Sequence, residues 1–414
     1  MKKEKYVDNM KETSLIISAS KIDSVKIKDI TKKSVRIYDG GYIGIAGGIG
    51  EVSTEELEKK AKENIKNKIP YEYEISKDKC ISIDKTSEGM NDKELLSEGE
   101  ELLSRLCKEN EDFIFSHKIT MMERSTSLSN DENLNLSYKD KSICTELIFK
   151  EKSSSSIFDG FIGYEGRKYN REQYLNMASR ILKAYKNEVS LPLEGKYKVG
   201  VYMDSCEELF LQIFSKDLNG RTFKKGGSIF SEKTGKKLFN ENFTLMQTKN
   251  PKDVCLQPYF DMEGTVTEDY SYNLIENGVL LSPYTDKKTS KLYNLKNTAA
   301  ASGNYDEVPT LGVPTLKVKP SNKTLKELFN GEEGILVYIA SGGDYTSSGK
   351  FGTPVQLAFL FDGEHIIGRL PELQISSDVY KMFNEDFLGV CSDSLFGLEG
   401  GKVMVMNMDV KNMK

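Results

Sequence analysis

Runs of β-branched and aromatic residues, separated by short polar or glycine-containing segments, organise the first part of the chain. Alternation of apolar and polar side chains is typical of half-buried strands. The predicted strands are residues 14–18, 24–30, 34–38 and 42–46, with Thr31-Lys32-Lys33 as the turn between the second and third and Asp39-Gly40-Gly41 as the turn before the fourth. Ser53 and Glu56 have the spacing of a capping box, which predicts a polar helix that ends near Lys68.

Leucines at helical spacing mark the next element. A helix is expected to start at Asn91, because the leucines that follow it share one side of a helix. These leucines are Leu95, Leu96, Leu102, Leu103 and Leu106. Residues 111–166 then have the pattern of an antiparallel meander, with polar tips at 129–133 and 139–141, and a third helix is expected to begin near Asn170.

A change of pattern at Leu191-Pro192-Leu193-Glu194-Gly195 indicates a domain boundary, so we expect domains of residues 1–193 and 194–414. The second domain opens with a predicted strand, 196–203. Ser205 and Glu208 then predict a capping box and a helix over 206–218. Later residues are Gly-rich and β-like, with helices expected near 285–295 and 376–383. The expected fold class is α+β: an N-terminal α/β domain with a sheet and helices, and a β-rich C-terminal domain with few helices.

Charge and composition narrow the range of partners. The 414 residues include 58 basic and 63 acidic ones, for a net charge of −5, so we expect neither nucleic acid nor an anionic membrane surface as a partner. No apolar run reaches the roughly 18–20 residues needed to cross a bilayer. The basic N-terminus lacks the apolar core of a signal peptide. Six cysteines stand singly, without a CxxC motif, which favours reduced thiols and a cytoplasmic protein.

Histidine limits the available chemistry. His117 and His365 are the only two in the sequence, so a mechanism that needs three is excluded. Both are expected to be surface imidazoles. No Ser/His/Asp or Cys/His arrangement stands out, and the carboxylates of Asp204-Ser205-Cys206-Glu207-Glu208 are interpreted as caps and turns.

Several later segments carry a resemblance to a known family. Residues 331–369 contain an apolar run, a Gly/Ser/Thr loop at 341–352, a second strand-like run and a turn at Asp362-Gly363. Further segments follow the same family order: 228–235 (SIFSEKTG), 272–281 (YNLIENGVLL) and Gly389-Val390-Cys391. Together they resemble the TldD/PmbA family, closely over residues 197–409 and more loosely over 27–188.

The resemblance implies a metallopeptidase family whose TldD branch carries His-Glu-x-x-x-His and a later Cys as zinc ligands. An ungapped count back from 228–235 places Leu211 and Lys216 at the histidine positions and Gln212 at the glutamate position. Cys391 occupies the cysteine position. Leu has no donor atom, Lys is protonated near neutral pH, and Gln cannot activate a metal-bound water. We therefore expect no catalytic residue, metal or cofactor in this chain, which is similar to the PmbA (TldE) branch, and a buried structural role for Cys391.

The Gly/Ser loop allows two interpretations. Its backbone N–H groups could bind a peptide carboxylate or backbone, or the loop could be a flexible hairpin tip. The residues concerned are Gly342, Gly343, Ser347, Ser348 and Gly349.

The resemblance leads to two main functional hypotheses. The first is a non-catalytic, metal-free subunit of a TldD/TldE-type zinc peptidase that acts on unstructured peptides in proteolysis or peptide maturation. Its partner would be a zinc-bearing TldD-type subunit in a heterodimer, or a second copy of this chain. The second is a stand-alone peptide- or protein-binding regulatory module, of the kind called a modulator of DNA gyrase. An independent metallopeptidase with an unrecognised site is disfavoured by the scarcity of histidine.

Overall fold

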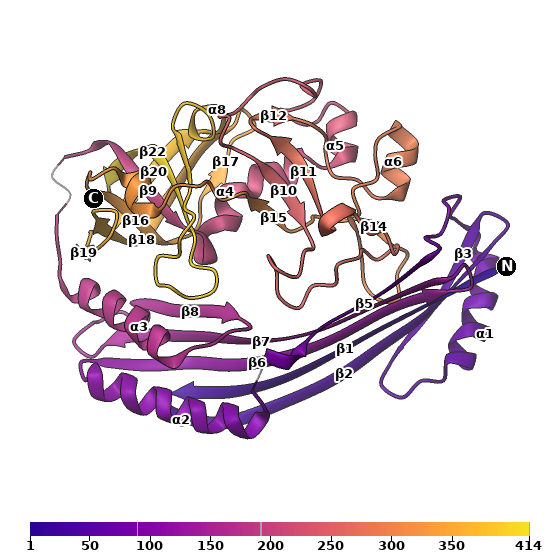
Figure 1. Ribbon diagram of the computed structural model, residues 1–414, viewed down its shortest axis with the longest axis horizontal. Coiled ribbons are helices and arrows are strands. Elements are labelled where there is room, and N and C mark those ends of the chain that lie inside the picture. The colour runs from indigo at the N-terminus through magenta and orange to yellow at the C-terminus, as the bar shows by residue number, and fades with distance from the viewer. Residues whose placement is uncertain (89, 191–192, 414) are drawn as a thin grey trace.

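A computed structural model describes residues 1–88, 90–190 and 193–413. Two sheets of eight strands each dominate it and helices are few, so the α+β class expected from the sequence is confirmed. Figure 1 shows the N-terminal sheet as a long, curved layer with the C-terminal part of the chain stacked above it. Among the described residues, no helix has the length and apolar character to cross a membrane.

Long antiparallel hairpins form the N-terminal sheet. Its strand order is β4-β3-β2-β1-β6-β7-β5, with β8 paired to β7 off this path. The strands are β1 (Lys2–Ser18), β2 (Lys21–Asp39), β3 (Tyr42–Ile49), β4 (Ile69–Pro70), β5 (Lys79–Lys85), β6 (Phe113–Asn130), β7 (Leu134–Glu151) and β8 (Gly160–Gly166). β1 pairs with β2 and β6 with β7 along nearly their whole lengths, and β5 pairs in parallel with β7.

Two turns expected inside this sheet are wrong. Residues 31–33 continue β2, and residues 139–141 continue β7. Asp140 explains the second error, because its buried carboxylate binds Arg167 and so stands inside the protein rather than at a polar tip. Lys32 explains the first, because its backbone is paired on both sides, with Asp8 and with Ile49. The turns at 40–41 and 131–133 are confirmed.

Three helices accompany the N-terminal sheet: α1 (Thr54–Asn64), α2 (Asp92–Glu109) and α3 (Arg171–Lys186). The Ser53 hydroxyl accepts the Glu56 N–H and caps α1, but the Glu56 carboxylate pairs with Lys60 and not with the Ser53 N–H, so the full capping box is absent. The helical segment ends with a short 3₁₀ turn, Ile65–Asn67. Asn91 caps α2 with a complete capping box, and four of its five predicted leucines are buried. α3 begins after its cap, Asn170, as expected.

The C-terminal eight-stranded sheet closes on itself. Its order is β16-β9-β22-β20-β18-β17, and an additional β16–β18 pairing completes the ring; β19 and β21 attach to it. The strands are β9 (Gly195–Tyr202), β16 (Gly334–Ala340), β17 (Asp344–Tyr345), β18 (Lys350–Phe361), β19 (Ile366–Arg369), β20 (Leu373–Asp378), β21 (Phe387–Val390) and β22 (Val403–Asn412). Residues 191 and 192 of the expected boundary segment lie outside the described residues.

Shorter elements complete the C-terminal part. A four-stranded sheet has the order β12-β11-β10-β15, and β13 pairs with β14. These strands are β10 (Leu245–Thr248), β11 (Ser271–Glu276), β12 (Val279–Leu280), β13 (Ala301–Ser302), β14 (Thr310–Leu311) and β15 (Leu316–Val318). The helices are α4 (Met203–Asp217), α5 (Gly220–Lys224), α6 (Lys287–Tyr293), α7 (Leu325–Phe329) and α8 (Val379–Met382), with 3₁₀ turns at Thr86–Glu88 and Glu268–Tyr270. Helices were expected near α6 and α8, although β20 occupies the first part of the 376–383 segment.

Two large apolar clusters hold the fold together. One lies within the C-terminal part and includes Phe210, Leu211 and Phe214 of α4. The other contains residues from both parts of the chain, such as Leu102 of α2 and Val405 of β22. The two parts therefore share a core, which fixes how the N-terminal sheet faces the C-terminal elements.

Candidate functional site

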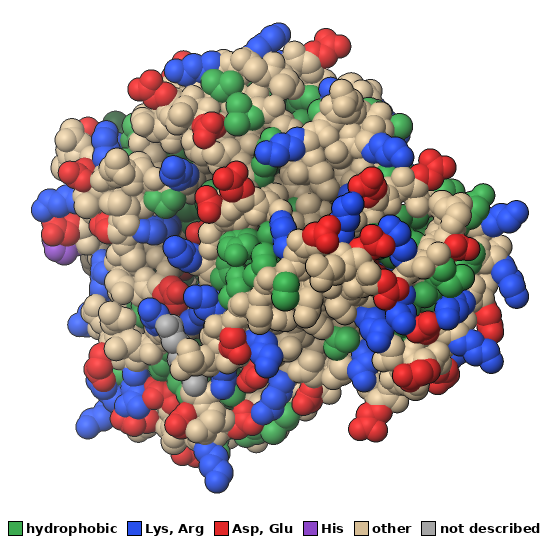
Figure 2. Space-filling model, turned by 45° about the vertical axis from the view of Figure 1, so that its right-hand side comes forward, with side chains coloured by type: hydrophobic (Ala, Val, Ile, Leu, Met, Phe, Trp, Pro, Cys, Tyr) green, Lys and Arg blue, Asp and Glu red, His purple; other side chains and the backbone are tan. Residues whose placement is uncertain are grey.

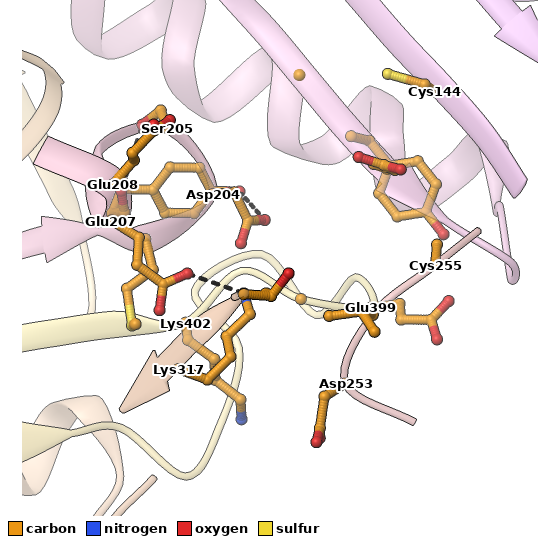
Figure 3. Close-up of a pocket in the computed structure, with 18 of the residues that line it drawn as sticks. Cys144, Asp204, Ser205, Glu207, Glu208, Asp253, Cys255, Lys317, Glu399 and Lys402 are labelled. Atoms are coloured by element: carbon orange, nitrogen blue, oxygen red, sulfur yellow. Dashed lines mark hydrogen bonds and ion pairs between the residues drawn. The ribbon is translucent and has the colours of Figure 1, made fainter. Parts of the chain in front are cut away.

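A cavity of about 970 Å³ lies between the N-terminal sheet and the C-terminal part of the chain. Most of its lining comes from β7 and β8 with the residues beside them, the start of α4, the loop at 252–257, β15 and the loop at 399–402, and single residues of β6, β10 and β21 complete it. In Figure 3, Asp204 and Glu207 lie on one side of the cavity and Cys144 on the other. The cavity is thus built by segments that are distant in sequence.

The first turn of α4 forms one wall. β9 ends at Tyr202 and α4 begins at the next residue, earlier than the predicted start at 206. The capping box expected from Ser205 and Glu208 is absent, because Tyr202 is the N-cap and Ser205 lies inside the first turn, where its hydroxyl donates to the carbonyl of Tyr338 at 2.6 Å. Freed from capping, Glu208 lines the cavity together with Asp204. The Asp204 carboxylate accepts the Gly401 N–H at 2.9 Å, which joins α4 to the 399–402 loop.

An ion pair stands inside the cavity. The Lys317 ammonium on β15 lies 2.9 Å from one carboxylate oxygen of Glu207, whose side chain is only 13% exposed. Burial raises the pKa of Glu207, although Lys317 opposes that shift. For Lys317, burial disfavours the charge, but the nearby carboxylates outweigh it and raise its pKa. Each member of the pair therefore favours the charged form of the other, against the burial that disfavours both charges.

Arg167 anchors the N-terminal wall to the C-terminal part. Its guanidinium makes two hydrogen bonds to the buried Asp140, at 2.7 and 2.6 Å, and donates to the carbonyl of Pro251 at 2.6 Å. The Arg167 backbone N–H in turn donates to Glu399 at 2.9 Å. Bidentate, charge-assisted pairs of this kind are geometrically specific. They hold β8 against the 251–254 and 399–402 loops, so the cavity is a fixed feature of the fold.

Negative charge predominates in the cavity. Seven carboxylates line it, against four cationic side chains and His117. Glu165 of β8 has its pKa raised, first by loss of hydration and then by repulsion from Glu146 and Asp204. Asp204 also has a raised pKa, from loss of hydration, although the Gly401 N–H opposes it. The carboxylates of Glu165, Glu146 and Asp204 therefore repel one another, and a bound cation would reduce this repulsion.

Two cysteines line the cavity without forming a nucleophilic site. Loss of hydration and nearby carboxylates raise the pKa of Cys144 and that of Cys255 to about 12 each, so both remain thiols at neutral pH. The thiolate is the reactive form. His117 does not serve as a base for Cys144 but faces Glu146, with 3.6 Å between its Nε2 and the carboxylate.

Comparison with known proteins supplies the family. Residues 194–412, more than half of the chain, match the family described as PmbA/TldA metallopeptidase C-terminal domain. The chain belongs to the PmbA/TldD family. No curated protein sequence matches it.

Solved structures of low sequence identity share the fold of this PmbA/TldD member. TldE from Thermococcus kodakarensis is similar with a TM-score of 0.77 at 17% identity, over 99% of this chain and 95% of that one. A proposed modulator of a DNA gyrase from Thermotoga maritima has a TM-score of 0.78 at 16% identity, over 99% and 96%. A proposed modulator of DNA gyrase from Bacteroides thetaiotaomicron has a TM-score of 0.71 at 16% identity, over 100% and 94%.

The four positions that the family resemblance assigned to zinc do not form a donor set. Leu211 is buried in the C-terminal cluster, whereas Gln212 and Lys216 are exposed on α4. Cys391 belongs to the other cluster, where its sulfur accepts the Val403 N–H at 3.2 Å and burial raises its pKa to about 11. Over the described parts of the chain, no group of three His, Cys, Asp or Glu residues could hold a metal ion. These residues do not fit zinc.

The Gly/Ser loop of this family member is a closed hairpin. β17 pairs with β18, and Tyr345 is anchored by a 2.7 Å hydrogen bond from its hydroxyl to the Phe210 carbonyl. The Gly349 N–H is used within the tip, where it donates to Thr346 at 3.0 Å. Gly342, Ser347 and Ser348 are exposed, Gly343 is half-buried and Gly349 is buried. A peptide-binding role for these five residues stays a prediction.

The sequence contained one signal for the cavity that was misread. Three carboxylates within five residues follow β9 directly, at 204, 207 and 208. A strand that leads at once into a helix places the first helical turn, with any polar side chains on it, at the end of a sheet. The partners from β8, β15 and the 399–402 loop could not be found by spacing, because only the tertiary fold brings them together.

Proposed function

We propose that this chain is the metal-free subunit of a TldD/TldE-type zinc peptidase that acts on unstructured peptides. It holds an extended peptide, and a TldD-type partner supplies the zinc and the hydrolytic chemistry. The observation that carries the proposal is the composition of α4: its C-terminal half has an apolar side chain, an amide and an ammonium where zinc ligands are required.

The donor chemistry supports a non-catalytic role. A catalytic zinc needs three protein ligands and an open position. Leu211 offers no donor, and the exposed Lys216 offers an ammonium. The Cys391 thiol is the one conventional ligand among the four, and it is occupied by backbone groups on both sides of its sulfur. A change of one residue would not complete such a site.

The cavity supports peptide binding. β15 is an edge strand that pairs only with β10, and Thr315, Lys317 and Val318 line the cavity. The carbonyl of Thr315 and the N–H of Lys319 bond to the β10 side. Alternation along a strand therefore directs the N–H and C=O of Leu316 and Val318 away from β10. An extended peptide can add there through main-chain hydrogen bonds, which do not depend on its sequence.

A mixing experiment tests the proposal. This chain and a TldD-type protein from the same organism are purified separately, mixed, and passed over a sizing column with light-scattering detection. Cleavage of a quenched fluorescent peptide of unstructured sequence is followed for each chain and for the mixture. A mixed complex that cleaves faster than the TldD-type chain alone supports the proposal.

Two variants serve as controls for the mixing experiment, and three results would contradict or change the proposal. The TldD-type chain with both motif histidines changed to Ala should abolish cleavage by the mixture, whereas Cys391→Ser in this chain should leave it intact. Cleavage by this chain alone would contradict a non-catalytic role. If this chain binds the peptide but forms no complex with the TldD-type protein, the result favours the stand-alone regulatory module. If this chain forms only a homodimer, its partner is a second copy of itself and not a TldD-type subunit.

A further inference from the structure

We propose that the inter-sheet cavity selects a basic side chain of the bound peptide, lysine or arginine, and holds its cationic group among Glu165, Asp204 and Glu207. The inference rests on the proposed peptide-binding function and names the substrate class of that same site.

Three of the four cations that line the cavity already have partners. The Arg167 guanidinium is neutralised by Asp140, which is not part of the lining, and by two backbone carbonyls. The Lys402 ammonium donates to the carbonyls of Ser392 and Asp393. Lys317 is paired with Glu207. Arg167 is thus neutralised from outside the lining and Lys317 by Glu207, so the other six lining carboxylates face only Lys252 and Lys402 among the lining cations.

Several carboxylates that line the cavity have oxygens that can accept further hydrogen bonds. Within the described ranges, neither Glu165 nor Glu208 has a hydrogen bond or ion pair to its carboxylate. Glu399 uses one oxygen for the backbone N–H groups of Arg167 and Lys168, which leaves the other open. The available carboxylates come from β8, from α4 and from the 399–402 loop, so a cation in the middle could meet acceptors from both parts of the chain.

Three lining residues, Thr145, Tyr164 and Glu207, carry a buried side-chain oxygen that lacks a hydrogen-bond partner in the described parts of the chain. The second carboxylate oxygen of Glu207 (Oε1) is fully buried with no hydrogen-bond partner in the described parts of the chain. The Tyr164 hydroxyl is also unpaired, in a residue that is only 5% exposed. An unpaired buried polar atom costs about 1–3 kcal/mol. A multivalent N–H donor would satisfy these acceptors.

The apolar lining of the cavity and the local excess of carboxylates are both compatible with a bound lysine or arginine side chain. Phe158, Phe161 and Met203 line the same cavity and provide apolar contacts for the methylene stem of lysine or arginine. On the molecular face in Figure 2, acidic and basic side chains are interspersed. Figure 3 shows the carboxylates gathered around the cavity, so the acidic bias is local. Such a bias inside a concave site focuses attraction on cations.

Three ten-residue peptides test the inference. They are Gly/Ser/Ala sequences that carry one central Lys, Gln or Glu, with blocked termini and an uncharged dye. Binding to the full chain is measured by fluorescence anisotropy at low salt. We expect the Lys peptide to bind roughly tenfold more tightly than the Gln peptide, the size of one charge-assisted hydrogen bond, and the Glu peptide most weakly. The preference should shrink as salt is added.

Glu165→Gln is the informative variant, because its carboxylate makes no hydrogen bond that folding requires. It should remove most of the preference for Lys, measured as the ratio of the affinities for the Lys and Gln peptides. Glu63→Gln, on exposed α1 far from the cavity, is the matched control and should keep the preference. Circular dichroism spectra check that both variants fold like the wild type.

The outcomes separate the two proposals. Equal binding of all three peptides, or tightest binding of the Glu peptide, would overturn the cationic preference and leave peptide binding in place. A preference for Lys that survives Glu165→Gln would also overturn the assignment to this cavity. Failure of every peptide to bind, both to this chain and to its mixture with the TldD-type partner, would overturn peptide binding itself.

Discussion

The two halves of α4 have opposite characters. Its first turn and a half, Met203 to Glu208, presents Asp204, Glu207 and Glu208 to a cavity. Its second half buries Phe210, Leu211 and Phe214 in the core and exposes Gln212 and Lys216. The family resemblance assigns zinc chemistry to the second half. In this chain the groups that can act on a ligand stand in the first half instead.

The contrast shows how a helix can keep its place in a fold while its chemistry changes. The second half still contributes packing, since the Phe214 ring contacts those of Phe230, Phe239, Phe243 and Phe383. Packing requires apolar volume and not particular donor atoms. The packing of the second half is therefore compatible with the absence of histidine at 211 and 216, and the cavity beside the first half is lined by other residues.

Phe214→Ala should have the largest effect. It removes a fully buried ring from the aromatic cluster and is expected to lower the free energy of unfolding by about 3–5 kcal/mol. Urea denaturation followed by circular dichroism measures the change. Glu208→Gln, at the cavity end of the same helix, is the comparison and should shift stability by less than about 0.5 kcal/mol. Equal effects at the two positions would contradict the division of α4.

The triple change Leu211→His, Gln212→Glu and Lys216→His tests the zinc register. It restores the family motif in sequence, but the residue at 211 is buried among apolar side chains while Cys391 lies in the other cluster. We expect destabilisation by about 2–4 kcal/mol, mostly from the buried imidazole, and no stoichiometric zinc. Metal analysis of the dialysed variant decides. One tightly bound zinc per chain would show that the site was only latent.

Glu165→Gln should alter how stability depends on pH. The native pKa of Glu165 is above its ordinary value of 4.5, so the folded protein keeps the proton to higher pH than the unfolded chain does. Stability must then fall as the pH rises from that value through the native pKa. The groups that face Glu165 are Glu146, Asp204, Lys317 and Arg167. The variant should match the wild type at low pH and exceed it above this window.

Denaturation midpoints at about pH 4 and about pH 7.5, on either side of ordinary carboxyl titration, measure the difference. Glu63→Gln provides the control, with no such gain expected. A loss of stability in Glu165→Gln at the higher pH would mean that the carboxylate has a stabilising partner in the folded state.

Gln212→Ala should have the smallest effect. The side chain is exposed, so stability should change by less than about 0.5 kcal/mol, and peptide binding should be unaffected. Urea denaturation and the anisotropy assay with the Lys peptide test both expectations. A marked loss of binding would bring the second half of α4 back into the functional site.

Local patterns predicted the elements that depend on local interactions. Asn91 with its capping box and the leucines of α2 are short-range features, and the helix begins where they indicate. Thr31-Lys32-Lys33 and Asp140 were misread because their strand pairing and ion pairing come from residues far along the chain. The cavity was missed for the same reason: Asp204, Glu165 and Lys317 are joined only by the tertiary fold.

The central claim is that this chain holds a peptide and its partner holds the zinc. The most direct measurement is the zinc content per chain, by mass spectrometry of the metal, for this chain alone, for a TldD-type protein alone and for their purified complex. The account predicts none in this chain and one zinc per TldD-type subunit in the complex. Stoichiometric zinc in this chain alone, lost on Cys391→Ser, would contradict it.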